Sequence, residues 1–138
     1  MSRAAEEPLP KPVPEPTPET EAFWEGCAAG ELRIQACEAC GAYSFFPTIA
    51  CQACHGTQLA WKTASGRGEV VTYTVVQRAM GAFSADAPFT LAIVRLAEGP
   101  QLMSRLVDAD PAQLRAGMPV AVTFETRGDQ SLPVFRPA

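Results

Sequence analysis

The chain has 138 residues, of which 47% are hydrophobic, and this fits one globular domain or two small modules that share a core. Eleven basic and fifteen acidic side chains give a net charge of −4, which disfavours binding to a nucleic-acid backbone or to an acidic membrane surface. No apolar run approaches the roughly 18 residues of a membrane span, and no signal-peptide pattern is present. Together with five cysteines, this predicts a reducing, cytoplasmic location.

Residues 1–18 form a proline-rich segment, with six prolines between Pro8 and Pro18. Proline has no backbone N–H and a fixed φ, so this segment is excluded from helix interiors and sheet ladders. Its composition predicts an extended, disordered linker. It is either a free terminus or a linker that follows another domain, in which case the chain is a fragment of a longer fusion.

A helix is predicted to begin at Thr17-Pro18, because Thr17 can cap it and proline suits its first turn. Gly30 is the expected C-terminal stop. Phe23 and Cys27 are four residues apart and share one face, which we expect to be buried. Cys27 is therefore interpreted as a small apolar core residue.

Two Cys-x-x-Cys pairs, Cys37/Cys40 and Cys51/Cys54, are separated by ten residues. Four thiolates that converge on one point form a tetrahedral Zn²⁺ site, and a site closed by four cysteines is structural rather than catalytic. Iron in a rubredoxin-like S₄ site is the main alternative metal. Two disulfides or a redox pair are disfavoured by the doubled motif and by the absence of a secretory signal.

Several side chains close to these cysteines need separate interpretation. His55, the only histidine, follows Cys54 and could replace it as the fourth ligand, but adjacent side chains seldom point the same way, so we expect His55 to face solvent. The glycines after each pair are expected to allow turns with positive φ. Aromatic residues in the spacer are expected to pack a short hairpin: Tyr43, Phe45 and Phe46.

From residue 60 onward, short segments rich in β-branched residues alternate with Gly/Pro turns. Five strands and one helical turn between the third and fourth strands fit a partly open Greek-key barrel of the OB type. The chain is thus predicted to be mainly β, with a Pro-rich linker, a module containing a helix and a rubredoxin-like zinc ribbon, and an OB-fold domain. These three parts cover 1–18, 19–59 and 60–138, and the strands cover 69–77, 89–96, 101–107, 120–124 and 132–135.

OB barrels often bind single-stranded nucleic acid through their second and third strands. Here those strands offer Phe89, Arg95 and Arg105 but no second aromatic residue, and Phe89 is expected in the core. Single-stranded nucleic-acid binding therefore stays as the alternative function. The apolar loop 79–88 contains Met80 and Phe83, which either anchor a partner or cover the end of the barrel.

The sequence contains no evident catalytic set. G-x-S-x-G, G-x-G-x-x-G and P-loop motifs are absent, and a lone histidine makes an independent nucleophilic enzyme improbable. Asp86 and Asp108 are candidate acids, but they lie where loops normally place solvated carboxylates.

The order of motifs resembles that of the DUF35 family, over residues 20–138. The resemblance implies a rubredoxin-like zinc ribbon followed by an OB fold, with structural zinc on Cys37, Cys40, Cys51 and Cys54. The motifs that carry it are Phe23-Trp24, the four-cysteine ribbon, and residues 65–70, 73–76, 88–89, 117–120 and 132–137.

The resemblance also implies a function. Members are non-catalytic accessory subunits that form hetero-oligomers with thiolase-fold enzymes of the lipid-transfer-protein type, which act on acyl-CoA thioesters, for example in retro-aldol cleavage of a steroid side chain. Acyl-CoA would lie at the interface. Apart from the resemblance, Arg78 or Arg136 could meet its phosphates, but surface solubility is the more usual role of such side chains. In some steroid-degrading actinobacteria the module follows a MaoC-like hydratase domain, and the Pro-rich segment would suit such a fusion. No catalytic residue is implied.

Overall fold

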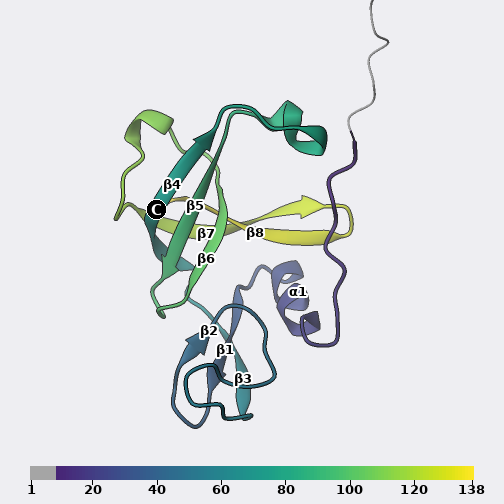
Figure 1. The fold of residues 1–138 in the computed structure, drawn as a ribbon, viewed down its shortest axis with the longest axis vertical. Coiled ribbons are helices and arrows are strands. Elements are labelled where there is room, and N and C mark those ends of the chain that lie inside the picture. The colour runs from purple at the N-terminus through teal and green to yellow at the C-terminus, as the bar shows by residue number, and fades with distance from the viewer. Residues whose placement is uncertain (1–8) are drawn as a thin grey trace, which may run out of the picture.

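The structure of the protein is a computed structural model that describes residues 9–138. One short helix is followed by a three-stranded sheet and then by a closed five-stranded barrel (Figure 1). The predicted mainly-β architecture, a helix with a ribbon before an OB-type barrel, is therefore confirmed. None of the helices in the described part of the chain is long and apolar enough to cross a membrane.

Helix α1 (Glu21–Ala28) begins later than the sequence predicts, because residues 18–20 form a turn and Thr20 takes the cap position. The carbonyl oxygen of Thr17 accepts hydrogen bonds from the amides of Thr20 and Glu21, and these bonds close that turn. The helix ends at Ala28, and Gly30 follows as the predicted stop. The φ of Gly30 is +78°, a left-handed conformation that glycine adopts without strain.

The ribbon sheet has the strand order β2-β1-β3, with both outer strands antiparallel to β1. Gln35 in the centre of β1 lies opposite Trp61 of β3, so the ribbon sheet continues past residue 60, where the sequence pattern changes. The three strands are β1 (Arg33–Cys37), β2 (Tyr43–Ser44) and β3 (Leu59–Thr63).

The barrel has the strand order β4-β5-β6-β8-β7, with β7 returning to β4. We expected a partly open barrel, but it is closed, because β6 pairs with β8 in parallel at Leu106 and Phe135. The predicted helical turn is also present as η2, where the Asp110 side chain accepts a bond from the Ala112 amide at 3.0 Å. The elements are β4 (Arg67–Val76), η1 (Gly81–Asp86), β5 (Phe89–Leu96), β6 (Gln101–Leu106), η2 (Pro111–Gln113), β7 (Pro119–Arg127) and β8 (Gln130–Pro137).

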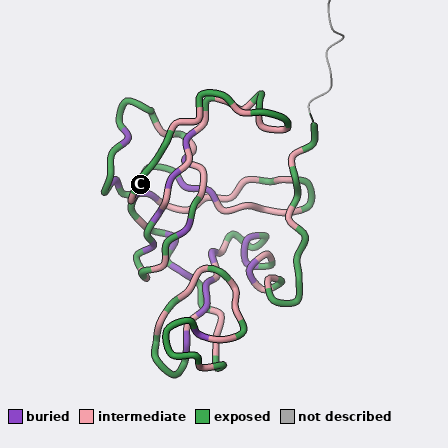
Figure 2. The backbone as a smooth tube through the Cα atoms, viewed as in Figure 1, coloured by how far each residue is buried: buried purple, intermediate pink, exposed green. Residues whose placement is uncertain are grey.

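The helix, the ribbon and the barrel share one hydrophobic core. Buried positions lie along the barrel strands and also on α1 and β1 (Figure 2). Phe23 and Cys27 of α1 belong to the same cluster as Val94 and Phe135 of the barrel. This confirms the predicted buried face of α1. It also means that the two modules bury apolar surface against each other, so their relative position is stabilised by the hydrophobic effect.

The proline-rich segment, predicted as a disordered linker, is described from residue 9 onward; residues 1–8 lie outside the described part. Residues 9–17, which we call the N-terminal segment, form neither helix nor strand. They lie against the barrel, with Lys11 bonded to Asp86 of η1 and Val13 beside Gly128 in the turn between β7 and β8 (Figure 1).

Candidate metal centre and interdomain groove

The four predicted ligand cysteines converge in the ribbon. Their Sγ atoms all lie within 4.8 Å of one another. The Sγ atoms of Cys37 and Cys54 are 3.6 Å apart, as are those of Cys40 and Cys51. Four sulfurs at about 2.3 Å from one tetrahedral ion are about 3.8 Å apart, so this geometry fits a closed S₄ metal site.

The two cysteine turns have the same backbone geometry, and this explains His55. Gly41 lies four residues after Cys37, and His55 lies four residues after Cys51. In each turn the amide of the later residue donates a hydrogen bond to the carbonyl oxygen of that cysteine at 2.8 Å. Both have a left-handed backbone, with φ of +75° and +65°. The positive φ in the second turn therefore belongs to His55 and not to Gly56. The His55 side chain is exposed, as expected, and the ligand cluster consists of cysteines alone.

Neighbouring amides and sulfur atoms shift the pKa values of the cysteine thiols in different directions. Amide groups of Cys54 and Ala53 lower the pKa of Cys51 to about 6, and the amides of Cys40 and Ala39 likewise lower the pKa of Cys37. For Cys54, the amide of Gly56 lowers the pKa, but the neighbouring sulfurs outweigh it and raise the pKa to about 12. The protein groups alone thus favour some thiolates and oppose others. A divalent cation would offset the repulsion and allow four thiolates to coexist.

Cys27 lies apart from this cluster, as the sequence predicts. It is buried in the shared core, and burial raises the pKa of its thiol to about 11. A neutral, inaccessible thiol packs as an apolar side chain and is a poor nucleophile.

A second feature is a groove of about 450 Å³ between the two modules. One wall consists of α1 and of the ribbon loop 45–47, and the other consists of residues from η1, β5, β6, β7 and β8. We call it the interdomain groove. Its lining is mostly apolar, and its aromatic and aliphatic members include Phe23, Phe45, Phe46, Phe89, Met103 and Pro133.

The aromatic residues of the spacer divide between the core and the surface. Phe45 packs edge to face against Phe23, with ring centroids 5.6 Å apart, so it fixes the ribbon loop to α1. Phe46 is exposed but its ring packs edge to face against Phe45, with centroids 5.2 Å apart. Tyr43 is exposed, so the expectation that it packs the hairpin is wrong. The expected core position of Phe89 is also wrong: it is half-buried and lines the groove.

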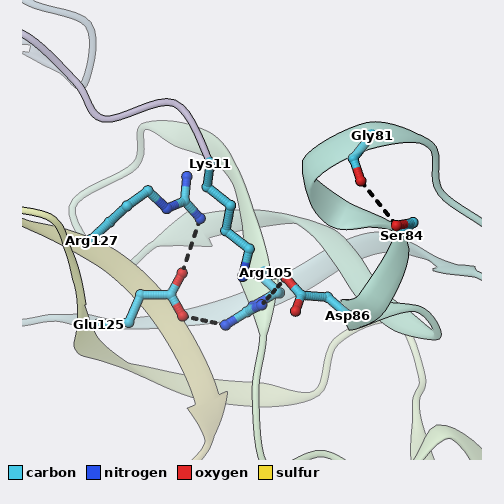
Figure 3. Close-up of polar contacts among 7 residues, drawn as sticks. All are labelled: Lys11, Gly81, Ser84, Asp86, Arg105, Glu125 and Arg127. Atoms are coloured by element: carbon cyan, nitrogen blue, oxygen red, sulfur yellow. Dashed lines mark hydrogen bonds and ion pairs between the residues drawn. The ribbon is translucent and has the colours of Figure 1, made fainter. Parts of the chain in front are cut away.

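Charged side chains form part of the groove's lining, and Figure 3 shows how they contact one another and Lys11. Glu125 accepts hydrogen bonds from Arg105 and from Arg127, the latter at 3.5 Å. Asp86 lies 2.5 Å from the Nζ atom of Lys11 and 4.0 Å from Arg105. We call these five residues the charged cluster.

The charged cluster accounts for the environments of two residues from the apolar loop, Asp86 and Phe83. A hydrogen bond from Lys11, helped by Arg105, lowers the pKa of Asp86, so this carboxylate is an ion-pair partner and is poorly suited to act as a general acid. The Phe83 ring lies below the Arg127 guanidinium, 5.5 Å from it, and Phe83 lines the groove. Met80, the other candidate anchor in the apolar loop 79–88, is exposed and lies outside the groove.

The remaining candidates do not form a site. Asp108, Arg78 and Arg136 are exposed, and neither arginine lines the groove. Arg95 is paired with Glu69 at 3.2 Å, and Arg105 is paired with Glu125. The two arginines considered for nucleic-acid binding are therefore each already paired with a carboxylate, which weakens that alternative.

The fold and the four-cysteine cluster define a protein made of a zinc ribbon joined to an OB barrel. Family models agree: residues 24–60 match "ChsH2, rubredoxin-like zinc ribbon domain" and residues 61–125 match "ChsH2, C-terminal OB-fold domain". The chain belongs to the DUF35 family, as its motif order predicts.

Two known proteins and one solved structure are similar to this chain over most of its length. The chain is 36% identical to a 3-oxo-4,17-pregnadiene-20-carboxyl-CoA hydratase alpha subunit of Mycobacterium tuberculosis, over 86% of this chain but only 38% of that subunit. It is 34% identical to a DUF35 domain-containing scaffold protein of Methanothermobacter thermautotrophicus, over 64% of this chain and 67% of the relative. The solved structure of an Ltp2-ChsH2(DUF35) aldolase matches with a TM-score of 0.80 and 29% identity, over 91% of this chain and 98% of the matched chain.

Proposed function

We propose that this chain is a non-catalytic accessory subunit, or module, of an enzyme that acts on acyl-CoA thioesters. Its partner would be a thiolase-fold enzyme of the lipid-transfer-protein type, joined in a cytoplasmic hetero-oligomer that cleaves or forms C–C bonds, as in retro-aldol cleavage of a steroid side-chain acyl-CoA. The observation that carries this proposal is the likeness to the Ltp2-ChsH2(DUF35) aldolase over 91% of the chain. The hydratase alpha subunit, named for an acyl-CoA substrate, supports the same substrate class.

The chemistry of the described residues supports a non-catalytic role. Four of the cysteines are gathered in the S₄ cluster, and the fifth, Cys27, is buried with a raised pKa. His55 is exposed and lies on a turn rather than in a cleft with a nucleophile. A reactive thiol or hydroxyl needs an adjacent base or a lowered pKa in an accessible site, and none of these groups meets both conditions. The reacting groups would then belong to the partner.

The metal has a structural role in this proposal. Cys37, Cys40, Cys51 and Cys54 would hold one Zn²⁺, which would join the end of β1 to the loop that precedes β3. When bound, a four-cysteine zinc supplies folding free energy and has no open position for a substrate. Iron stays the alternative metal, because S₄ sites accept both ions.

The division of the chain follows the same reasoning. We propose residues 1–18 as a linker, residues 19–59 as the helix and zinc-ribbon module, and residues 60–138 as the OB module. The chain spans 38% of the length of the Mycobacterium tuberculosis subunit. The activity of that longer protein is therefore only a guide to the reaction in which this module takes part.

Reconstitution tests the proposed function. The chain is co-expressed with a thiolase-fold subunit of the Ltp2 type, and complex formation is followed by size-exclusion chromatography with light scattering. We expect a hetero-oligomer and acyl-CoA turnover only when both proteins are present. Turnover of an acyl-CoA thioester by the isolated chain would show that it is an enzyme itself, and salt-sensitive binding of an oligonucleotide by the isolated chain would support the alternative function instead.

A further inference from the structure

We infer that the interdomain groove is the docking surface for the partner enzyme, and that it receives an apolar segment of that enzyme carrying an acidic side chain. This inference rests on the proposed function for the existence of a partner. It adds the surface and the chemistry of the contact, and the relatives' names specify neither.

The rim of the groove exposes large apolar side chains from both modules. Phe46 on the ribbon loop is 69% exposed and Met103 on β6 is 67% exposed, and both line the groove. Exposed apolar patches of this kind mark contact sites on soluble proteins, and aromatic residues and Met are enriched at the centres of interfaces. A protein segment that covers both side chains would remove this surface from water.

The two walls are held in a fixed relation before any partner arrives. Helix α1 packs against β8, and Phe45 on the ribbon loop contacts Phe23 of α1. The rim residues Phe46 and Met103 are thus carried by structures that share one core. A preformed groove avoids part of the ordering cost of association, because its side chains and loops are already positioned. A segment bound there would contact the ribbon and the barrel at once.

The charged cluster indicates the sign of the charge that the bound segment should carry. Three cationic groups, Lys11, Arg105 and Arg127, face two carboxylates, Asp86 and Glu125 (Figure 3). The five residues of the charged cluster together carry one positive charge in excess, although the whole chain carries −4. Four of them line the groove, and the fifth, Lys11, lies 2.5 Å from the lining residue Asp86.

Arg105 lies at the centre of the charged cluster, because its Nη atoms contact both carboxylates. A carboxylate on the incoming segment would neutralise the excess charge of the cluster. The groove therefore favours an occupant that is apolar along its length and acidic where it meets the charged cluster.

The exposure of the rim favours a protein segment over a free acyl chain. Pockets for small molecules bury most of the ligand's surface between their own walls. Here the rim side chains are two-thirds exposed, so a narrow ligand lying at the base would leave them in water. Free acyl-CoA is accordingly the competing occupant that the experiment must separate from a protein.

The test uses the full chain and its partner. The partner is co-purified from the native source, identified by mass spectrometry and then purified alone, and its affinity for variants of this chain is measured by calorimetry. The groove variants are Met103→Glu and Phe46→Asp. The matched controls are Met80→Glu and Ile49→Asp, because Met80 is 91% exposed, Ile49 is 80% exposed, and neither lines the groove. All four residues are exposed, so we expect the variants to keep the wild-type melting temperature.

We expect each groove variant to weaken binding by about tenfold or more and each control to stay within about twofold, since tenfold is the loss of one good interface contact. Affinity for the wild type should fall as salt rises, because the charge contact is screened. Equal binding by all four variants would overturn the groove as the docking surface and leave the proposed function intact. Binding that does not change with salt would overturn the acidic occupant.

Two further outcomes separate the inference from the proposed function. If the identified partner lacks a thiolase fold but is still lost with the groove variants, the docking surface stands and the proposed partner class fails. If no protein is retained by the wild type, or if the isolated chain binds acyl-CoA and Met103→Glu removes that binding, the groove is not a protein-docking surface.

Discussion

The Nζ atom of Lys11 lies 2.5 Å from the Oδ2 atom of Asp86, and this contact joins the N-terminal segment to helix η1. Lys11 also lies 5.9 Å from the centre of the Phe83 ring, in the same element. Two interactions from one side chain thus hold a segment that forms neither helix nor strand. The proline-rich composition predicts its extended backbone, but the contact depends on where the barrel places Asp86.

Replacing Lys11 with Met should release the N-terminal segment without unfolding the barrel. The change removes the ion pair with Asp86, and we expect a lower heteronuclear NOE for the amide of Val13, which lies beside Gly128. The melting temperature should hardly change, because partly exposed ion pairs contribute little to stability. Lys62→Met is the control, since Lys62 is exposed on β3. An unchanged NOE in Lys11→Met would mean that the segment is held by its apolar contacts instead.

The same contact should depend on pH in a defined window. The hydrogen bond from Lys11 lowers the pKa of Asp86. A carboxyl group with a lowered pKa stabilises the folded contact at pH values above its ordinary pKa of about 3.9, and that contribution is lost as the pH falls through the folded value. The Val13 NOE should thus be constant from pH 7 to about 5 and fall only in stronger acid. A fall between pH 7 and 5 would assign the contact to another group.

Replacing Cys40 with Ser should remove the bound metal and unfold the ribbon. Three remaining thiolates leave the tetrahedral site incomplete, and the free energy of binding is part of the free energy of folding. Elemental analysis of wild-type protein should find about one metal ion per chain and should find little in Cys40→Ser. The control is Cys27→Ser, which alters a buried cysteine outside the cluster and should keep the metal. A metal-free wild type with normal stability would contradict the structural role.

Phe135 should be a major source of barrel stability. Its side chain is fully buried, and its backbone pairs with Leu106 where β6 and β8 close the barrel. Phe135→Ala should lower the free energy of unfolding in urea by about 3–5 kcal/mol, through lost burial and the resulting cavity. The exposed Phe46 is the matched control, and Phe46→Ala should stay within about 0.5 kcal/mol. Equal effects of the two variants would contradict the large contribution of Phe135 to the stability of the barrel.

Cys27 should make the fold sensitive to alkaline pH. Burial raises the pKa of its thiol from 9.0 to about 11. An acid whose folded pKa is raised contributes its full stability below the unfolded pKa and loses it as the pH rises toward the folded value. The free energy of unfolding should therefore decline between about pH 9 and 11, and the decline should be smaller in Cys27→Ala. An identical decline in both proteins would assign it to other groups.

Much of the metal cluster and of the barrel follows from local sequence. The spacing within each Cys-x-x-Cys pair forces a tight turn, so the convergence of Cys37 with Cys40 and of Cys51 with Cys54 needs little tertiary information. The strands of the barrel were predicted because β-branched residues alternate with Gly/Pro turns. The second strand, 89–96, matches β5 at both ends.

Other features are not local. The two turns share a backbone geometry, but the second one places His55 where the first has Gly41, and a non-glycine residue with positive φ carries no signal in the sequence. Barrel closure at Leu106 and Phe135 depends on a parallel pairing between strands that are not adjacent in sequence. Periodicity predicts which residues form strands, but it does not predict which strand edges meet.

Spacing and side-chain chemistry in the sequence predicted a four-thiolate cluster, a short helix with one buried face, and short β-branched strands that form a barrel. These properties depend on spacing, side-chain chemistry and period, which act over a few residues. The groove and its charged cluster were decided by the tertiary structure alone. Phe23 is on α1, Phe45 is on the ribbon loop and Met103 is on β6. Lys11 and Asp86 are also far apart in the sequence, so only the folded core brings these side chains together.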